Sequence, residues 1–311
     1  MAATDSYSWA EGMIVLDRTA DMDGEALDAF AIDELLGRRV GEGAAPVCHL
    51  WRHPRALIMG AKDGRLPGAP EAVRLLMDAG YEAIVRGSGG AAVPLDAGVV
   101  NVSLVMPLAG AFAFGFRDDF ARMADLIKRA MAGYGLTVRH GEVEGSYCPG
   151  DYDLHIDGFK FCGIAQRRQV KAMIVSAFVN VAGSGDARAA QVRAFYDIAG
   201  VGAEPRSYPD VVAGRVTSLE ERGFAAEDAG AEVDGAVAAG DVNAEASAHG
   251  LVSAFVAAIV GTLRRWQTKL GPAEGAASTA NAGTLALPDP RDIAEMREKL
   301  AVRYMLPHSA R

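Results

Sequence analysis

Residues 151–165 read DYDLHIDGFKFCGIA, and this stretch carries the clearest fold signal in the chain. Two alternating runs flank Asp157-Gly158, a dipeptide typical of a two-residue type I′ hairpin turn. Such a turn predicts these cross-strand pairs: Ile156 with Phe159, His155 with Lys160, Leu154 with Phe161, and Asp153 with Cys162. Because side chains alternate along a strand, one face is predicted to be core and the other polar. The core face has Leu154, Ile156, Phe159 and Phe161, and the polar face has Asp153, His155, Lys160 and Cys162.

Cys148 lies just before this hairpin, in a loop that contains Pro149-Gly150. Two interpretations remain open at this point. Cys148 is a small buried apolar residue, as free cysteines often are, or the loop folds back and brings the thiol near the Lys160 ammonium. A neighbouring cation or backbone N–H group favours the thiolate, which is the reactive form. The plain alternative for Lys160 is a strand lysine that points to solvent.

The composition is that of a globular protein with one large domain or two ordinary ones. The chain has 311 residues, 50% of them hydrophobic and 23% charged, and a net charge of −9. This negative charge disfavours nucleic acid and anionic membranes as partners. The N-terminus lacks a signal-peptide pattern, and the apolar runs are shorter than the roughly 20 residues of a membrane span. Three cysteines do not make a disulfide framework, so we expect reduced thiols and a cytoplasmic location.

Helices and strands follow one another without the regular alternation of a doubly wound sheet. Apolar spacing predicts helices over 24–37, 70–79, 117–134 and 186–199, and a last one from near His249, with Gly37 ending the first. Strands are predicted within 46–61, 81–107 and 151–181, most firmly from Val99 to Val105. The predicted fold class is therefore α+β, with a mixed or antiparallel sheet flanked by helices.

The composition changes between Phe224 and Ala248. This stretch holds six acidic residues and no Lys or Arg, among mostly Ala and Gly. Such a composition is typical of a solvated linker or insertion. We therefore expect a first domain over 1–223, a linker over 224–248, and a C-terminal helical segment over 249–311 packed on the same domain.

The glycine-rich stretch VRGSGGAAVPLD covers residues 85–96. Gly87, Gly89 and Ala92 nominally match the dinucleotide-binding fingerprint, but that fingerprint requires a following helix. Pro94 and the β-rich run after it predict a strand instead, so the dinucleotide interpretation fails. Glycines also let backbone N–H groups approach a ligand, with Arg86 at the entrance and Ser88 capping the turn. The remaining alternative is a tight turn with no ligand.

Taken together, these motifs resemble the lipoate–protein ligase/octanoyltransferase superfamily, which shares its catalytic fold with the biotin–protein ligases. The resemblance runs from about Ala29 to Val181, through AIDELL (31–36), LIMGAKD (57–63), the glycine-rich stretch and GFKFCGIAQRR (158–168). Within the superfamily, SYCPGDYDL (146–154) followed by FKFCGIAQRR is similar to the cysteine-dependent amidotransferases. These enzymes move an octanoyl group from the glycine-cleavage H protein to lipoyl domains of 2-oxoacid dehydrogenases.

The resemblance implies roles for particular residues. Cys148 accepts the acyl group as a thioester, and Lys160 contacts the acyl carbonyl. Cys162 stands where the family has a small residue, so we interpret it as packing. The implied substrate-binding residues are Arg86, Gly87, Ser88, Gly89, Gly90, Ala91, Ala92, Val93, Asp96 and Gly163.

The resemblance also bears on cofactors and donors. The ATP-using ligases have two arginines before Ser-Gly-Gly and a histidine before the Asp, where this chain has Val85 before Arg86 and Leu95 before Asp96. This departure, together with the presence of Cys148, favours acyl transfer without ATP. We expect no cofactor and no metal.

The expected partners are the glycine-cleavage H protein and the lipoyl domains of 2-oxoacid dehydrogenase E2 subunits, and the group moved is octanoyl or lipoyl. Three alternatives remain: an octanoyltransferase using acyl carrier protein, an ATP-dependent lipoate ligase, and a non-catalytic lipoyl-domain-binding protein.

Overall fold

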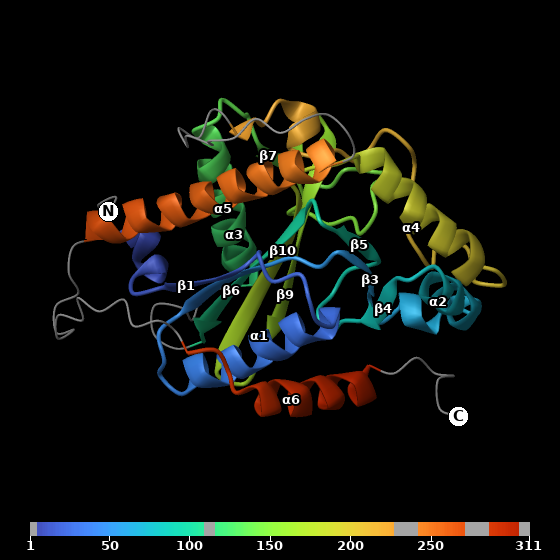
Figure 1. Cartoon of the computed structure of the whole chain (residues 1–311), viewed down its shortest axis with the longest axis horizontal. Helices are drawn as coiled ribbons and strands as arrows, with labels where there is room; N and C mark the ends of the chain where they lie inside the picture. Colours follow the sequence, from blue (N-terminus) through green and yellow to red (C-terminus); the bar gives the residue numbers. More distant parts are fainter. Residues whose placement is uncertain (1–4, 109–115, 227–241, 271–285, 305–311) are drawn as a thin grey trace.

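The computed structural model describes residues 5–108, 116–226, 242–270 and 286–304, in two sheets with helices around them (Figure 1). The larger sheet has seven strands in the order β1-β2-β6-β10-β9-β8-β7. Its first pair is parallel and the remaining pairs are antiparallel. Its strands are β1 (Ile14–Arg18), β2 (Val47–Trp51), β6 (Val99–Pro107), β7 (Arg139–His140), β8 (Leu154–Ile156), β9 (Phe159–Arg168) and β10 (Ala172–Asn180).

The smaller sheet has the order β4-β3-β5 and lies beside the larger one (Figure 1). It consists of β3 (Arg55–Met59), β4 (Glu82–Val85) and β5 (Val93–Asp96), with one parallel and one antiparallel pair. Helices α2 (Ala69–Asp78) and α4 (Gly185–Ala199) pack together next to it. The glycine-rich turn joins β4 to β5 rather than opening a helix, which confirms that it is not a dinucleotide-binding turn.

Helices cover both faces of the larger sheet (Figure 1). On one face lie α1 (Ala26–Gly41) and α6 (Pro290–Arg303), and on the other α3 (Phe116–Ala132) and α5 (Val242–Leu270). Alternation along β6 divides its residues between the two sides: Val100, Val102 and Leu104 join the core under α3 and α5. The predicted α+β class with a mixed sheet is confirmed. Three 3₁₀ turns complete the described elements: η1 (Asp5–Ala10), η2 (Asp63–Arg65) and η4 (Glu220–Arg222).

The hairpin forms around the predicted turn, and both turn residues have positive φ, +52° at Asp157 and +84° at Gly158. The pairs Ile156 with Phe159 and His155 with Lys160 are confirmed, but the register shifts at the next position and Leu154 pairs with Cys162. The predicted pairs Leu154 with Phe161 and Asp153 with Cys162 are wrong. The backbone of Lys160 bonds to Arg215 and Thr217 on its other side, and the ladder bulges immediately after it.

Two helix boundaries also differ from the prediction. α1 continues through Gly37, so this glycine is not a helix end. Its lack of a side chain makes room for Gln169 instead, since a Cβ there would lie 2.7 Å from the Gln169 amide oxygen. α5 begins at Val242 rather than near His249, within the stretch 224–248, of which residues 227–241 lie outside the described residues. The division into domains stays a prediction.

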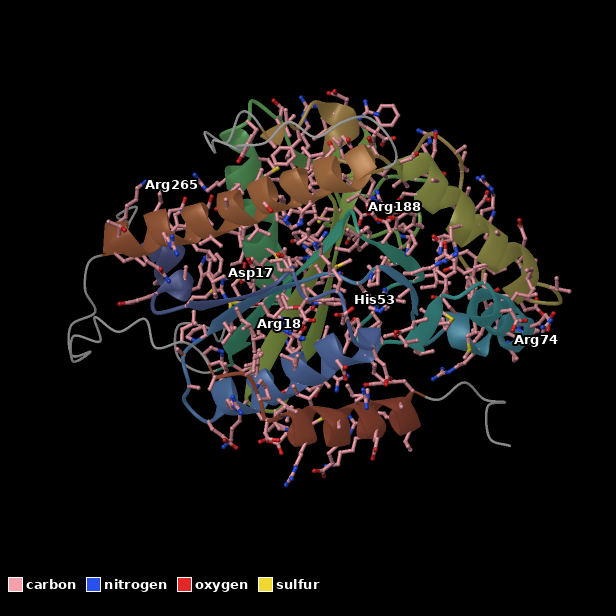
Figure 2. All side chains as sticks on the ribbon, in the orientation of Figure 1. Asp17, Arg18, His53, Arg74, Arg188 and Arg265 are labelled. Atoms are coloured by element: carbon pink, nitrogen blue, oxygen red, sulfur yellow. The ribbon has the colours of Figure 1, made fainter. Side chains whose placement is uncertain are left out.

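The segment Ser247–Leu270 of α5 is long and apolar enough by composition to span a membrane, contrary to the expectation that all apolar runs are too short. In this fold one side of it is core, with Leu251, Phe255, Ile259, Leu263 and Trp266 buried. Its polar side carries residues such as Arg265, which points outward in Figure 2, as Arg74 does on α2. The pattern is that of an amphipathic helix packed on α3.

Candidate active site

Cys148 sits at the tip of the loop between β7 and β8 with a left-handed backbone, φ +47°. This conformation is uncommon for a residue with a side chain and costs on the order of 1 kcal/mol. The thiol is half-buried, whereas Cys48 and Cys162 are fully buried. Burial raises the pKa of Cys48 to about 12 and that of Cys162 well above its usual value. Cys148 is therefore the least buried of the three thiols, and Cys162 is part of the core, in agreement with the packing role predicted for it.

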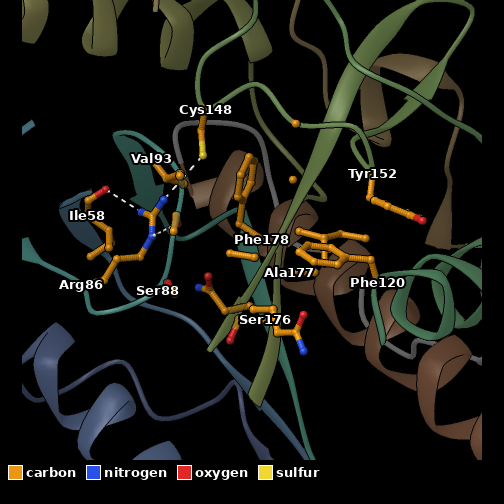
Figure 3. A pocket seen from close by; sticks show the side chains of 18 of the residues that line it. Ile58, Arg86, Ser88, Val93, Phe120, Cys148, Tyr152, Ser176, Ala177 and Phe178 are labelled. Atoms are coloured by element: carbon orange, nitrogen blue, oxygen red, sulfur yellow. Dashed lines mark hydrogen bonds between the residues drawn. The ribbon is translucent and has the colours of Figure 1, made fainter. Parts of the chain in front are cut away.

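The Cys148 sulfur faces the glycine-rich turn (Figure 3). The Ala91 backbone N–H donates to Sγ at 3.2 Å, and Nη2 of Arg86 donates at 3.5 Å. Gly90, with φ +95°, makes this approach possible, because a Cβ there would lie 2.7 Å from both Sγ and Nη2. One backbone donor of this turn, the Ala91 N–H, thus meets the Cys148 sulfur, and the approach of the turn to a ligand stays a prediction.

Arg86 is buried rather than at the entrance, which corrects the prediction. Its guanidinium organises the turn by donating to the carbonyls of Ile58 at 3.0 Å, Gly89 at 3.2 Å and Ala91 at 2.7 Å. In the described part of the chain, each hydrogen-bond partner of Arg86 is a carbonyl or the Cys148 sulfur. The carboxylate of Asp63 acts on this cation only through space. The positive charge of Arg86 is thus left without a carboxylate in contact.

Lys160 is fully buried, so the alternative of a solvent-facing lysine is wrong. Its Nζ donates to the Cys148 carbonyl at 2.6 Å and the Tyr147 carbonyl at 2.8 Å, and forms an ion pair with Oδ2 of Asp153 at 2.7 Å. The lysine therefore approaches the backbone of Cys148, while the sulfur turns to Arg86. Burial raises the pKa of Asp153 to about 6, although the Lys160 charge opposes this shift.

A cavity of about 470 Å³ opens beside the Cys148 sulfur, within the range of roughly 300–1,000 Å³ typical of small-molecule sites. Its floor includes one row across the larger sheet: Trp51 pairs with Asn101, Asn101 with Phe178, and Phe178 with Gly163. Gly163 leaves room for the Phe178 ring, since a Cβ there would lie 2.5 Å from it. Aromatic and aliphatic side chains dominate the walls: Phe30, Ile58, Val93, Leu95, Phe120 and Tyr152 (Figure 3).

The predicted substrate-binding residues divide into two groups. Six line the cavity with Cys148: Arg86, Ser88, Gly89, Gly90, Val93 and Gly163. Four do not: Gly87, Ala91, Ala92 and Asp96.

Each of these four residues has another contact. Ala91 supplies its N–H to the sulfur. Ala92 donates its backbone N–H to the Tyr196 hydroxyl. Asp96 pairs with the buried Arg188 at 2.7 Å. A Cβ at Gly87 would overlap Arg167 and Tyr304. Ser88 lines the cavity, and no capping bond from its side chain is observed.

Several site residues were not predicted from the sequence. Trp51, Asn101 and Phe178 lie on three strands, and only the sheet register places them in one row. Gly60, within the LIMGAKD motif, could have been singled out as a close-approach glycine, since a Cβ there would overlap the Gly90 carbonyl. α6 was missed as well, although Asp289 followed by Pro290 is a recognisable helix start.

The chain is similar to known proteins in sequence and in fold. Residues 25–229 match the lipoyl protein ligase A/B catalytic domain family. A curated relative from Geobacillus kaustophilus, named octanoyl-[GcvH]:protein N-octanoyltransferase, is 43% identical over 202 residues, covering 63% of this chain and 70% of the relative. One from Listeria monocytogenes, named lipoyl-[GcvH]:protein N-lipoyltransferase, is 36% identical over 199 residues, 63% of this chain and 71% of the relative. The predicted enzyme class, a protein acyltransferase, is confirmed.

Solved structures extend the similarity to the fold of nearly the whole chain. A lipoate protein ligase from Thermoplasma acidophilum with bound lipoic acid matches 94% of this chain and 95% of its own, with a TM-score of 0.55 and 16% identity. A lipoate-protein ligase A bound with ATP matches 84% of this chain and 92% of its own, with a TM-score of 0.54 and 19% identity. The predicted fold is confirmed, and the chain belongs to the lipoyl protein ligase A/B catalytic domain family.

Proposed function

We propose that this protein moves an octanoyl group from a lysine amide of the glycine-cleavage H protein to a lysine of lipoyl domains of 2-oxoacid dehydrogenases, through a thioester on Cys148. The observation that carries the proposal is the half-buried sulfur of Cys148, held by Ala91 N–H and Arg86 at an apolar cavity. The octanoyltransferase names of relatives about 40% identical to the chain support the donor.

The geometry supports a thiolate nucleophile. The Ala91 N–H points at the sulfur, and among the described residues no carboxylate is in contact with the buried Arg86 guanidinium. A thiolate at this position receives one backbone hydrogen bond and a charge-assisted one. Burial of the cation strengthens the attraction, because the effective dielectric constant is lower than that of water.

The proposed reaction is balanced without a cofactor. The thiolate sulfur attacks the amide carbonyl, the C–S bond forms, the C–N bond breaks, and the departing lysine nitrogen takes up one proton from water. An incoming lysine amine then attacks the thioester, a new C–N bond forms, the C–S bond breaks, the amine releases one proton to water, and the thiolate is restored. One lysine amide replaces another, so the overall free-energy change is near zero and two easier steps replace one difficult exchange. Each CH₂ of the acyl chain buried in the cavity contributes about 0.8 kcal/mol to binding.

The decisive experiment is an intact-mass assay with octanoylated H protein. We expect one octanoyl adduct on the wild-type protein, mapped to Cys148, and no adduct on Cys148→Ala, which also loses transfer. Cys162→Ala serves as the matched control and keeps the adduct. Transfer by Cys148→Ala at the wild-type rate would refute the proposal.

Lipoyl transfer is the second candidate, because a relative 36% identical to the chain is named a lipoyltransferase. Lipoylated H protein in the same assay decides between the two acyl groups. Octanoyl-acyl carrier protein and free octanoate with ATP and Mg²⁺ complete the donor series. A donor that alone supports acylation identifies the reaction, and binding of a lipoyl domain without any acylation indicates a non-catalytic binding protein.

A further inference from the structure

The Lys160 ammonium has no N–H left for a substrate. A lysine has three donors, and here they meet three oxygens: the carbonyls of Tyr147 and Cys148, at 2.8 and 2.6 Å, and Oδ2 of Asp153, at 2.7 Å. Contact with an acyl carbonyl would require one of these bonds to break inside the protein, where an unpaired polar group is costly. In this state Lys160 is bound to the loop that carries Cys148.

The two carbonyls bound by Lys160 lie on either side of one Cα atom. The Tyr147 carbonyl belongs to the peptide before the Cys148 Cα, and the Cys148 carbonyl to the peptide after it. Holding both oxygens on one ammonium restrains φ and ψ of Cys148, and hence the direction of its Cβ–Sγ bond. Without that restraint the φ of +47° is unfavourable for a residue other than glycine.

Asp153 holds the ammonium in this position. Its Oδ2 accepts from Lys160 and also from the Gly150 backbone N–H at 3.1 Å, so one carboxylate oxygen joins the lysine to the far end of the Cys148–Gly150 turn. Both side chains are almost fully buried, at 0% and 2% exposed. A buried ion pair contributes little to stability compared with apolar packing, and some such pairs specify one conformation instead.

We propose that Asp153 is a positioning residue for Cys148. Through Lys160 it holds the left-handed backbone at position 148, which keeps the sulfur on the Ala91 N–H and the Arg86 guanidinium. The positioning inference rests on the proposed thioester chemistry for its catalytic meaning, but the orientation of the thiol is measurable without any acyl substrate. In this structure Lys160 contacts the loop, and its contact with the acyl carbonyl, which the family resemblance implied, stays a prediction.

The test compares alkylation of Cys148 by iodoacetamide with single-turnover octanoylation. In Asp153→Asn we expect alkylation to slow by about tenfold, since the sulfur loses its held donors. Octanoylation should slow by about 100-fold with the KM for the donor unchanged, because a displaced nucleophile affects the chemical step. Asp153→Glu, which keeps the charge, should restore part of both rates. If Lys160 instead acted on the acyl group, Asp153→Asn would slow octanoylation and leave alkylation at the wild-type rate, and the inference would be wrong.

Asp153→Asn leaves a buried ammonium without its counter-charge, which threatens folding. The double variant Asp153→Asn/Lys160→Met removes both charges and keeps the test available. We expect it to fold and to show the same slow alkylation, whereas wild-type alkylation in this variant would overturn the inference. Asp119→Asn is the matched control, because Asp119 is also buried and its partners are Arg122, Gln166 and Arg168 rather than the Cys148 loop. It should keep the wild-type alkylation rate.

The two proposals fail separately. If wild-type Cys148 is never acylated while its alkylation depends on Asp153, the thioester function is wrong and the positioning role stands. If Cys148 is acylated and alkylation ignores both Asp153 variants, the function stands and the positioning role is wrong.

Discussion

Two buried cations flank Cys148, and they differ in what neutralises them. Lys160, from the hairpin, has a carboxylate at 2.7 Å and two backbone carbonyls. Arg86, from the glycine-rich turn, has carbonyls and the Cys148 sulfur as its hydrogen-bond partners among the described residues. A cation paired with a carboxylate, such as Lys160, can fix a local conformation. A cation with no carboxylate in contact can stabilise a neighbouring anion instead. The comparison therefore separates Lys160, which binds the backbone on both sides of the Cys148 Cα, from Arg86, which contacts the sulfur of the proposed nucleophile.

The largest expected effect comes from Arg86. Arg86→Met removes the charge-assisted donor to Sγ and three bonds that organise the turn, so we expect octanoylation to slow by about 1,000-fold. Arg86→Lys keeps a charge but loses the planar fork and should recover only part of the rate. Single-turnover acylation followed by mass spectrometry measures both variants. An Arg86→Met enzyme faster than Lys160→Met would reverse the roles assigned to the two cations.

A smaller effect is expected from Gly90. A methyl group at Gly90→Ala lies 2.7 Å from both the sulfur and the Arg86 guanidinium, on a backbone with φ +95°. We expect it to separate the two groups and slow octanoylation by about 100-fold. Gly43→Ala is the matched control, because Gly43 lies outside the cavity, has a similar φ of +106°, and a Cβ there meets nothing within 4 Å. Equal rates for the two variants would mean that contact between sulfur and guanidinium does not matter.

The smallest effect is the pH dependence of stability and of octanoylation that comes from Asp153, the carboxylate paired with Lys160. Burial raises the pKa of Asp153 from 3.8 to about 6, so the folded protein binds this proton more tightly than the unfolded chain does. Stability relative to Asp153→Asn/Lys160→Met should therefore fall as pH rises from about 4 to about 6, and level off above. Octanoylation should rise through the same window, as the carboxylate ionises and holds Lys160. Urea unfolding and single-turnover rates at several pH values measure both, and parallel trends would contradict the assignment.

The charge of Glu142 raises the pKa of Asp153, as burial does, so Glu142→Gln should move the pH range of both changes to lower pH.

Local signals explain which parts of the fold were predictable. The Asp157-Gly158 turn, the strand from Val99 and the helices over 70–79 and 186–199 were found from periodicity and turn residues. These patterns act within one element, where neighbouring residues decide the conformation. Gly37 was misread as a helix end for the same reason: its packing partner, Gln169, is distant in sequence.

The chain's own sequence was sufficient for the hairpin, for the glycine-rich turn as a strand connection, and for Cys148 as the candidate nucleophile in a loop before Lys160. Only the tertiary structure decided which cation meets the sulfur. The register shift after Lys160 pairs Leu154 with Cys162, so Asp153 lies outside the strand pairing. The backbone of residues 215–217 pairs with Lys160 on its other side. Gly90 and Gly60 then admit the turn that carries Arg86. The directions of the side chains around Cys148 depend on strand register and on close approach between segments distant in sequence. The residue pattern along one strand therefore does not predict them.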